Sequence, residues 1–169
     1  MLRSRARQLS AVVTTAAMAV AATGALAFTA QAAPTPLPET AAKAKVLNWL
    51  AHKHSDTMPR SVREGADWTV YAHLYEFKTG KPGKKIGDAT THCSAVEATP
   101  QGVVAQCQSV LRTDQGSITM SGSMDMFGPG PYGGDAAVTG GTGTYAEAEG
   151  QAEIVIDDDY AKLRISLDD

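Results

Sequence analysis

The sequence has little cysteine, no excess of positive charge and no long run of strongly apolar residues. Its two cysteines, Cys93 and Cys107, permit only one internal disulfide. With 15 basic and 18 acidic residues the formal net charge is −3, which argues against nucleic acid or anionic lipid as a partner. The uncharged run at residues 11–30 is mostly alanine and threonine, which gain little from lipid, so it makes a poor membrane span.

The N-terminus nevertheless has the organisation of an export signal. Arg3, Arg5 and Arg7 precede the uncharged run, and Ala30-Gln31-Ala32 offers a small-x-small cleavage site. The arginines are not adjacent, so the twin-arginine route is not indicated. We predict a signal peptide at residues 1–32 and secretion of the mature chain, with an uncleaved anchor as the alternative. Cleavage after Ala32 leaves 12 basic against 18 acidic residues, a net charge of −6.

Secretion places both cysteines where disulfides form and persist, so we predict a Cys93–Cys107 bridge, with two free thiols as the alternative. If a turn lies at residues 99–102, directly facing residues have numbers that add to 201, whereas the cysteine numbers add to 200. A β-bulge or a three-residue loop would supply the missing residue and bring the cysteines into register.

Apolar spacing divides the mature chain into two parts. Between residues 40 and 53 apolar residues recur at gaps of three and four, which predicts a short helix. We therefore assign residues 33–65 to a linker with a short helix, and residues 66–169 to one domain. From residue 66 onward apolar residues alternate, and turn signals separate the alternating runs. This pattern predicts strands at residues 67–77, 85–98, 103–112, 117–127, 135–139, 144–156 and 160–167, one of them long enough to bend or split.

Hairpin-connected strands of this kind either pack as two sheets or close on themselves, and we expect closure. The predicted fold class is therefore all-β, a closed antiparallel barrel of about eight strands. Most of the strands have one apolar and one polar face. In the strand at residues 67–77 neither face is clearly polar, so one side of it is expected to meet the N-terminal helix or another subunit.

A glycine-rich string, Ala137-Val138-Thr139-Gly140-Gly141-Thr142-Gly143-Thr144-Tyr145, is the most distinctive motif. A phosphate-binding loop would be followed by a helix, but here alternation follows, so we exclude that function. We assign Gly140, Gly141 and Gly143 to positions that need positive φ or close strand approach. Together with Lys85-Ile86-Gly87, the two cysteines and Gly116, the string resembles the allene oxide cyclase barrel and dirigent-like superfamily, particularly its secreted bacterial members, over residues 67–167. Glu149 departs from the family, which often has a basic residue nearby, and so does the N-terminal helix.

The resemblance implies an eight-stranded barrel with an apolar central cavity, no cofactor and a possible homotrimer. Related barrels cyclise unstable epoxides or steer the coupling of radicals, and the protein contributes mainly shape. Two functions follow: a cofactor-free cyclase or isomerase-like steering protein, or a non-catalytic extracellular or cell-surface barrel that binds a lipophilic molecule. None of the relatives' polar pocket residues can be matched one by one to this chain.

We expect the cavity to hold an apolar small molecule, because small residues and flexible methionines occupy the dry faces; a fully packed barrel is the alternative. The expected lining residues are Trp68, Val70, Leu74, Met120, Met124, Ala148, Leu163 and Ile165. Ionisable groups come mainly from the strand at residues 67–77, where the catalytic candidates are Tyr71, His73, Tyr75 and Glu76.

No metal site is predicted. His52 and His54 are two residues apart, whereas a helical ligand pair needs a spacing of three or four. The acidic stretch at residues 157–159 lacks the glycine and distal glutamate of a calcium loop, so we expect an acidic turn.

Overall fold

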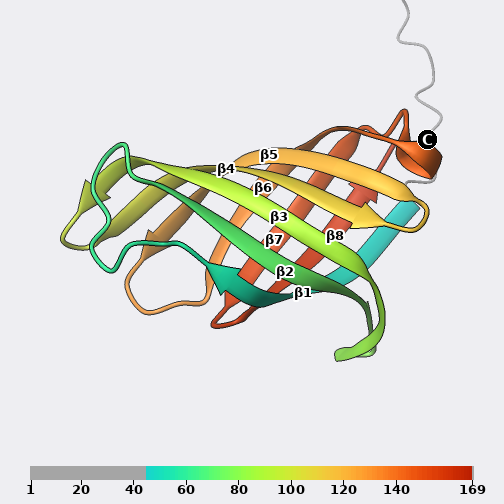
Figure 1. Cartoon of the computed structure of the whole chain (residues 1–169), viewed down its shortest axis with the longest axis horizontal. Helices are drawn as coiled ribbons and strands as arrows, with labels where there is room; N and C mark the ends of the chain where they lie inside the picture. Colours follow the sequence, from blue (N-terminus) through green and yellow to red (C-terminus); the bar gives the residue numbers. More distant parts are fainter. Residues whose placement is uncertain (1–44, 169) are drawn as a thin grey trace, which may run out of the picture. The chain divides into compact units, whose positions relative to one another are not determined.

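The computed structural model describes residues 45–168 (Figure 1). Eight strands form a closed antiparallel barrel, in which each strand pairs with its sequence neighbours and the first pairs with the last. The predicted fold class is therefore confirmed. The expected signal peptide lies outside the described residues. The strands are β1 (Lys45–Asp56), β2 (Asp67–Lys78), β3 (Lys81–Thr99), β4 (Gly102–Thr113), β5 (Gly116–Phe127), β6 (Tyr132–Gly141), β7 (Gly150–Asp157) and β8 (Tyr160–Leu167).

Strand β1 corrects the prediction of a helix at residues 40–53. The described part of that segment is extended and pairs with β2 on one side and β8 on the other; residues 40–44 lie outside the described part. Trp49 and Ala51 are buried in the core inside the barrel, and Leu50, on the opposite face of the strand, is also only 3% exposed. Because β1 has buried residues on both faces, its apolar residues do not alternate but recur at spacings of three and four, which are also the spacings of a helix. Pairing with both neighbouring strands removes two exposed sheet edges, and this gain overrides local helix propensity.

Because β1 closes the barrel, the barrel includes residues from Lys45, whereas the sequence placed the start of this domain at residue 66. A loop over residues 57–66 then leads from β1 to β2. In this loop the Thr57 amide donates to the Thr69 carbonyl at 3.0 Å, which ties the loop to β2. The helix that was expected to cover one side of β2 is absent among residues 45–53, and β1 lies beside β2 instead.

The hairpin of β3 and β4 confirms both the disulfide and its register. Thr99 pairs with Gly102 near the turn, and Cys93 lies directly opposite Cys107, with a register shift between Ala95 and Glu97. The extra residue is Val96, which is 54% exposed. Of the two alternatives that the cysteine numbering left open, a bulge or a three-residue loop, the structure has the one-residue bulge.

The segment predicted as one strand at residues 144–156 is interrupted. A 3₁₀ turn, η1 (Gly143–Tyr145), follows β6, and β7 begins only at Gly150. Gly140 and Gly143 have positive φ, 136° and 62°. At Gly141 a Cβ atom would come within 2.2 Å of the Tyr145 carbonyl oxygen. The three glycines therefore allow the chain to fold back sharply, and Tyr145 is buried in the core.

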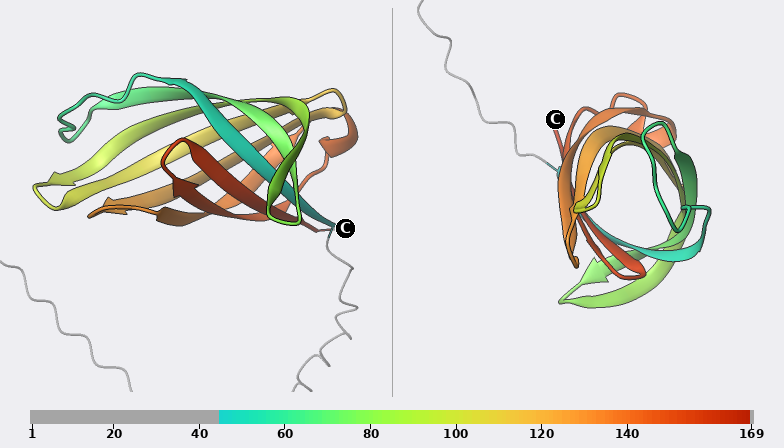
Figure 2. Two further views of the ribbon diagram at one scale, coloured as in Figure 1. Left: turned by 90° about the horizontal axis from the view of Figure 1, so that it is seen from below. Right: turned by 90° about the vertical axis from the view of Figure 1, so that its left-hand side faces the viewer.

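Large side chains fill one end of the barrel. Leu74, Leu111, Ile118 and Ile165 are fully buried there, and Trp49 meets Tyr145 edge to face with ring centroids 6.3 Å apart. The right-hand view of Figure 2 shows the ring of strands from the opposite end of the barrel, where the long β3–β4 hairpin lies. A smaller cluster made of Trp68, Cys93, Ala95 and Ala105 lies toward that end. No helix within residues 45–168 is long and apolar enough to cross a membrane.

Candidate functional site

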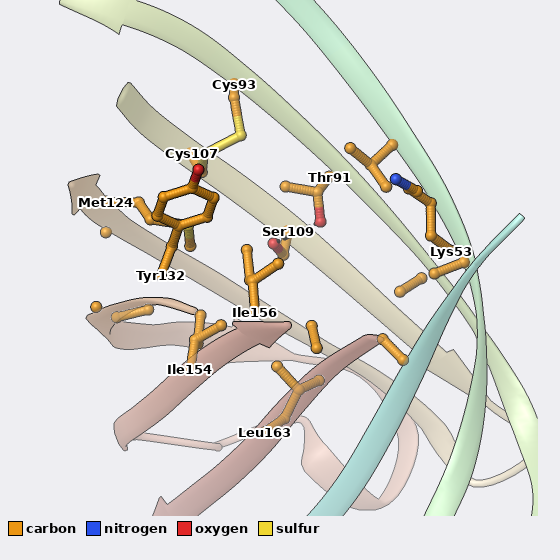
Figure 3. Close-up of a pocket in the computed structure, with 18 of the residues that line it drawn as sticks. Lys53, Thr91, Cys93, Cys107, Ser109, Met124, Tyr132, Ile154, Ile156 and Leu163 are labelled. Atoms are coloured by element: carbon orange, nitrogen blue, oxygen red, sulfur yellow. Dashed lines mark hydrogen bonds between the residues drawn. A yellow bond between two sulfur atoms is a disulfide. The ribbon is translucent and has the colours of Figure 1, made fainter. Parts of the chain in front are cut away.

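A cavity of about 290 Å³ lies inside the barrel, toward the end opposite the large core side chains (Figure 3). All eight strands contribute lining residues, and many of these are small. Their side chains are too short to meet across the barrel, which leaves the interior hollow. The volume is near the lower limit of about 300 Å³ for small-molecule sites. The small residues in the lining are Ala51, Ala72, Ala89, Gly122, Gly134, Ala136 and Ala161.

Five of the eight residues expected in the cavity lining are placed there by the structure: Trp68, Val70, Met120, Met124 and Leu163. The other three are buried in the core and do not line the cavity: Leu74, Ala148 and Ile165. Leu74 and Ile165 point inward as expected, but they lie at the filled end of the barrel. Ala148 follows η1 and precedes β7, so it is not on a strand.

The rim of the cavity is charged. The Lys53 ammonium lies 3.0 Å from a carboxylate oxygen of Asp159 and 3.3 Å from one of Asp56. The bond to Asp159 is the main cause that raises the pKa of Lys53 above its ordinary value, against a smaller opposing effect of burial. Lys53 therefore stays protonated at neutral pH. The acidic turn after β7 thus contributes a partner for the cation at the mouth.

Two facing hydroxyl groups interrupt the apolar wall, in addition to the phenol of Tyr132, which donates to the Gly128 carbonyl at 2.9 Å. Thr91 on β3 and Ser109 on β4 face each other in register, both line the cavity, and their oxygens are 2.9 Å apart. Figure 3 shows both side chains beside the disulfide and pointing into the cavity. The position of this pair inside the barrel could have been predicted from the sequence. A Cys93–Cys107 bridge fixes which face of the hairpin is internal, and Thr91 and Ser109 are each two residues away on that face.

The four catalytic candidates on β2 lie away from the cavity. Tyr71, His73, Tyr75 and Glu76 are half-buried, and none of them lines it. Tyr71 and His73 alternate with the inward-facing Val70, Ala72 and Leu74, so they project from the outer face of the sheet.

On that face His73 joins a cluster of rings, with its centroid 5.0 Å from that of His54 and 5.5 Å from that of Tyr71. Burial is the main cause that lowers the pKa of His73, and the nearby charges of Lys85 and His54 act in the same direction. A hydrogen bond donated by Lys78 lowers the pKa of Glu76. Within residues 45–168 no group of three or more His, Cys, Asp or Glu side chains is arranged to hold a metal ion.

Comparisons with known proteins place this geometry in a class of barrels. No protein-family model matches the sequence, and no curated protein matches it. Solved structures do match. A pyocyanin demethylase superposes with a TM-score of 0.58 at 19% identity, covering 73% of this chain and 99% of that chain. The pterocarpan synthase dirigent protein superposes with a TM-score of 0.57 at 15% identity, covering 83% and 97%. The chain therefore shares its barrel fold with a dirigent protein, in agreement with the fold that the sequence resemblance implied.

Proposed function

We propose that the protein binds a small, largely apolar molecule inside the barrel. The observation that carries this proposal is the hollow half of the barrel, an apolar cavity with a charged rim. Small-molecule sites are typically concave, mostly apolar and supplied with a few polar groups. The apolar wall would hold the body of the ligand, and the rim at Lys53 would stay in contact with water.

Binding can be tested with the neutral fluorophore N-phenyl-1-naphthylamine. At about −0.3 kcal/mol for each of about 17 non-hydrogen atoms, the dissociation constant should be about 0.2 mM or lower. Fluorescence of the bound probe should rise and shift to the blue. Trp68 lines the cavity, so its emission should fall in parallel.

A matched pair of variants on β3 locates the binding site. Ala89 lines the cavity and is buried, whereas its neighbour Thr90 is exposed on the other face. Ala89→Leu should weaken probe binding at least tenfold because the larger side chain occupies the cavity, and Thr90→Leu should leave it unchanged. No saturable probe binding, or equal binding by both variants, would contradict the proposal. Far-ultraviolet circular dichroism checks that both variants fold.

Steering of a cofactor-free cyclisation or coupling is the second candidate function. The similarity to a protein named as a dirigent protein and pterocarpan synthase favours it. The hydroxyl groups in the cavity wall beside the disulfide belong to Thr91, Ser109 and Tyr132, and the ion pairs of Lys53 lie at the rim. Catalysis would therefore depend on holding one reactive conformation, which lowers the entropy cost of bond formation.

Coupling of coniferyl alcohol by a one-electron oxidant tests this second candidate. Free coupling gives racemic dimers. A steering protein should give an enantiomeric excess that Ala89→Leu abolishes and Thr90→Leu retains. Racemic dimers at saturating protein, with probe binding intact, would leave binding alone as the function.

We also propose that the mature chain is secreted. The Cys93–Cys107 disulfide supports an oxidising compartment, and the N-terminal sequence has the pattern of an export signal. Expression of the full chain in a secreting host should yield a product in the medium that begins at Ala33. That product should carry no thiol that can be alkylated before reduction. Retention of an uncleaved chain in the cell would contradict secretion.

A further inference from the structure

The Thr91–Ser109 pair lies within an apolar part of the barrel wall. Across the sheet, Thr91 pairs with Val70 on β2, and Ser109 pairs with Met120 on β5. All four residues line the cavity. A row through the middle of this wall therefore presents two adjacent hydroxyls between two apolar side chains.

One of the two O–H donors of Thr91 and Ser109 has no acceptor within residues 45–168 of the protein. Two hydroxyls carry two O–H groups, and one of these is used in the 2.9 Å bond between the oxygens, in which either can donate. Among the hydrogen bonds of the described residues neither oxygen has a second partner. The second O–H belongs to a side chain that lines the cavity, and the neighbouring side chains of Val70 and Met120 have no strong acceptor to offer.

A purely structural function for such a pair would fit the outer face better. There Thr139 donates to Thr119 at 3.0 Å on the exposed side of β5 and β6, and Thr119 donates in turn to the Gly140 carbonyl at 3.1 Å, so both O–H groups of that pair have acceptors in the protein. Inside the barrel the same chemistry lowers the apolar character of a cavity wall, and the second O–H is left for water or a ligand in the cavity.

We infer that Thr91 and Ser109 are the specificity-determining pair of the cavity, and that they donate a hydrogen bond to an oxygen atom of the ligand. The ligand class is a small ring or chain compound that is apolar except for a carbonyl, ether or hydroxyl oxygen placed against β3 and β4. This inference rests on the proposed function and adds to it the chemical group that orients the ligand.

The test compares 1-indanone with indane, which share a ring skeleton and differ by one carbonyl. Each displaces N-phenyl-1-naphthylamine from the wild-type protein and from the double variant Thr91→Val with Ser109→Ala, which keeps the shape of the wall. The measured quantity is the ratio of the dissociation constants of indane and indanone. Solvation of the free ligands cancels when this ratio is compared between proteins.

The ratio should fall by about 3- to 10-fold in the double variant, the effect expected for one hydrogen bond. It should not change in the control variant Thr139→Val, which removes a hydroxyl from the outer-face pair. An unchanged ratio in the double variant, with both compounds still binding, would overturn the inference and leave the proposed function standing. Failure of both compounds and of the fluorophore to bind the wild-type protein would overturn both.

Discussion

Removing the disulfide is the sharpest test of how the barrel is held together. The perturbation is the double variant Cys93→Ala with Cys107→Ala. The bridge closes a loop of 15 residues, for which loop-closure entropy gives about 3 kcal/mol of stability. That is a large share of the roughly 5–15 kcal/mol that stabilises a typical domain. For a domain of this size the midpoint of thermal unfolding should fall by about 10 °C.

Urea unfolding followed by tryptophan fluorescence measures the change, because the two tryptophans, Trp49 and Trp68, are both buried. The wild-type protein with its disulfide reduced and its thiols alkylated should lose a similar free energy of unfolding. The double variant should not respond to reductant, and this serves as the control. A loss below about 1 kcal/mol, or a reductant effect of equal size in both proteins, would refute the reasoning that the bridge acts by restricting the unfolded chain.

Three further predictions follow from the core, the glycine turn and the outer face. Leu74→Ala should cost about 2–5 kcal/mol in urea unfolding, because Leu74 is fully buried in the filled end, whereas Val110→Ala, at an exposed position, should change stability by about 0.5 kcal/mol or less. Gly143→Ala should cost about 1–3 kcal/mol, because φ is 62° and the new Cβ would lie 2.4 Å from the Gln115 carbonyl oxygen; an unchanged unfolding midpoint would contradict this. Because the pKa of His73 is lowered in the folded state, mainly by burial, the unfolded chain binds the proton more readily. The free energy of unfolding should therefore fall as pH decreases through the range just below about 6.5, and His73→Gln should reduce that dependence in paired measurements at neutral and mildly acidic pH.

The strands predicted correctly from the sequence were those in which the inward-facing residues are buried and the outward-facing residues are exposed. Strand β8 alternates cleanly between Leu163, Ile165 and the residues between them, and its predicted bounds agree with the structure. The cysteine numbers required a bulge or a three-residue loop, and the structure has a bulge at Val96. Strand β1 could not be predicted in the same way. Leu50 is buried on the outer face, so the alternation that identifies a strand is lost.

The candidate site was predicted only in part, because facing inward does not determine depth along the barrel. Leu74 and Trp68 both point inward from β2, yet only Trp68 reaches the cavity. Which end is hollow depends on where small residues from different strands coincide, and this requires the register of all eight strands. The ion pair of Lys53 with Asp159 joins β1 to the turn before β8, a contact that the prediction of a helix for β1 concealed.

The division of the barrel into a filled and a hollow half affects how such a protein can evolve. Each strand contributes to both halves, so the residues that secure folding and those that would meet a guest molecule are separated along the same strands. Replacements at the cavity surface face open space on one side, so they disturb less packing than replacements in the filled end. The scaffold can therefore acquire a new chemical preference by a few substitutions near its mouth while the opposite end preserves the fold.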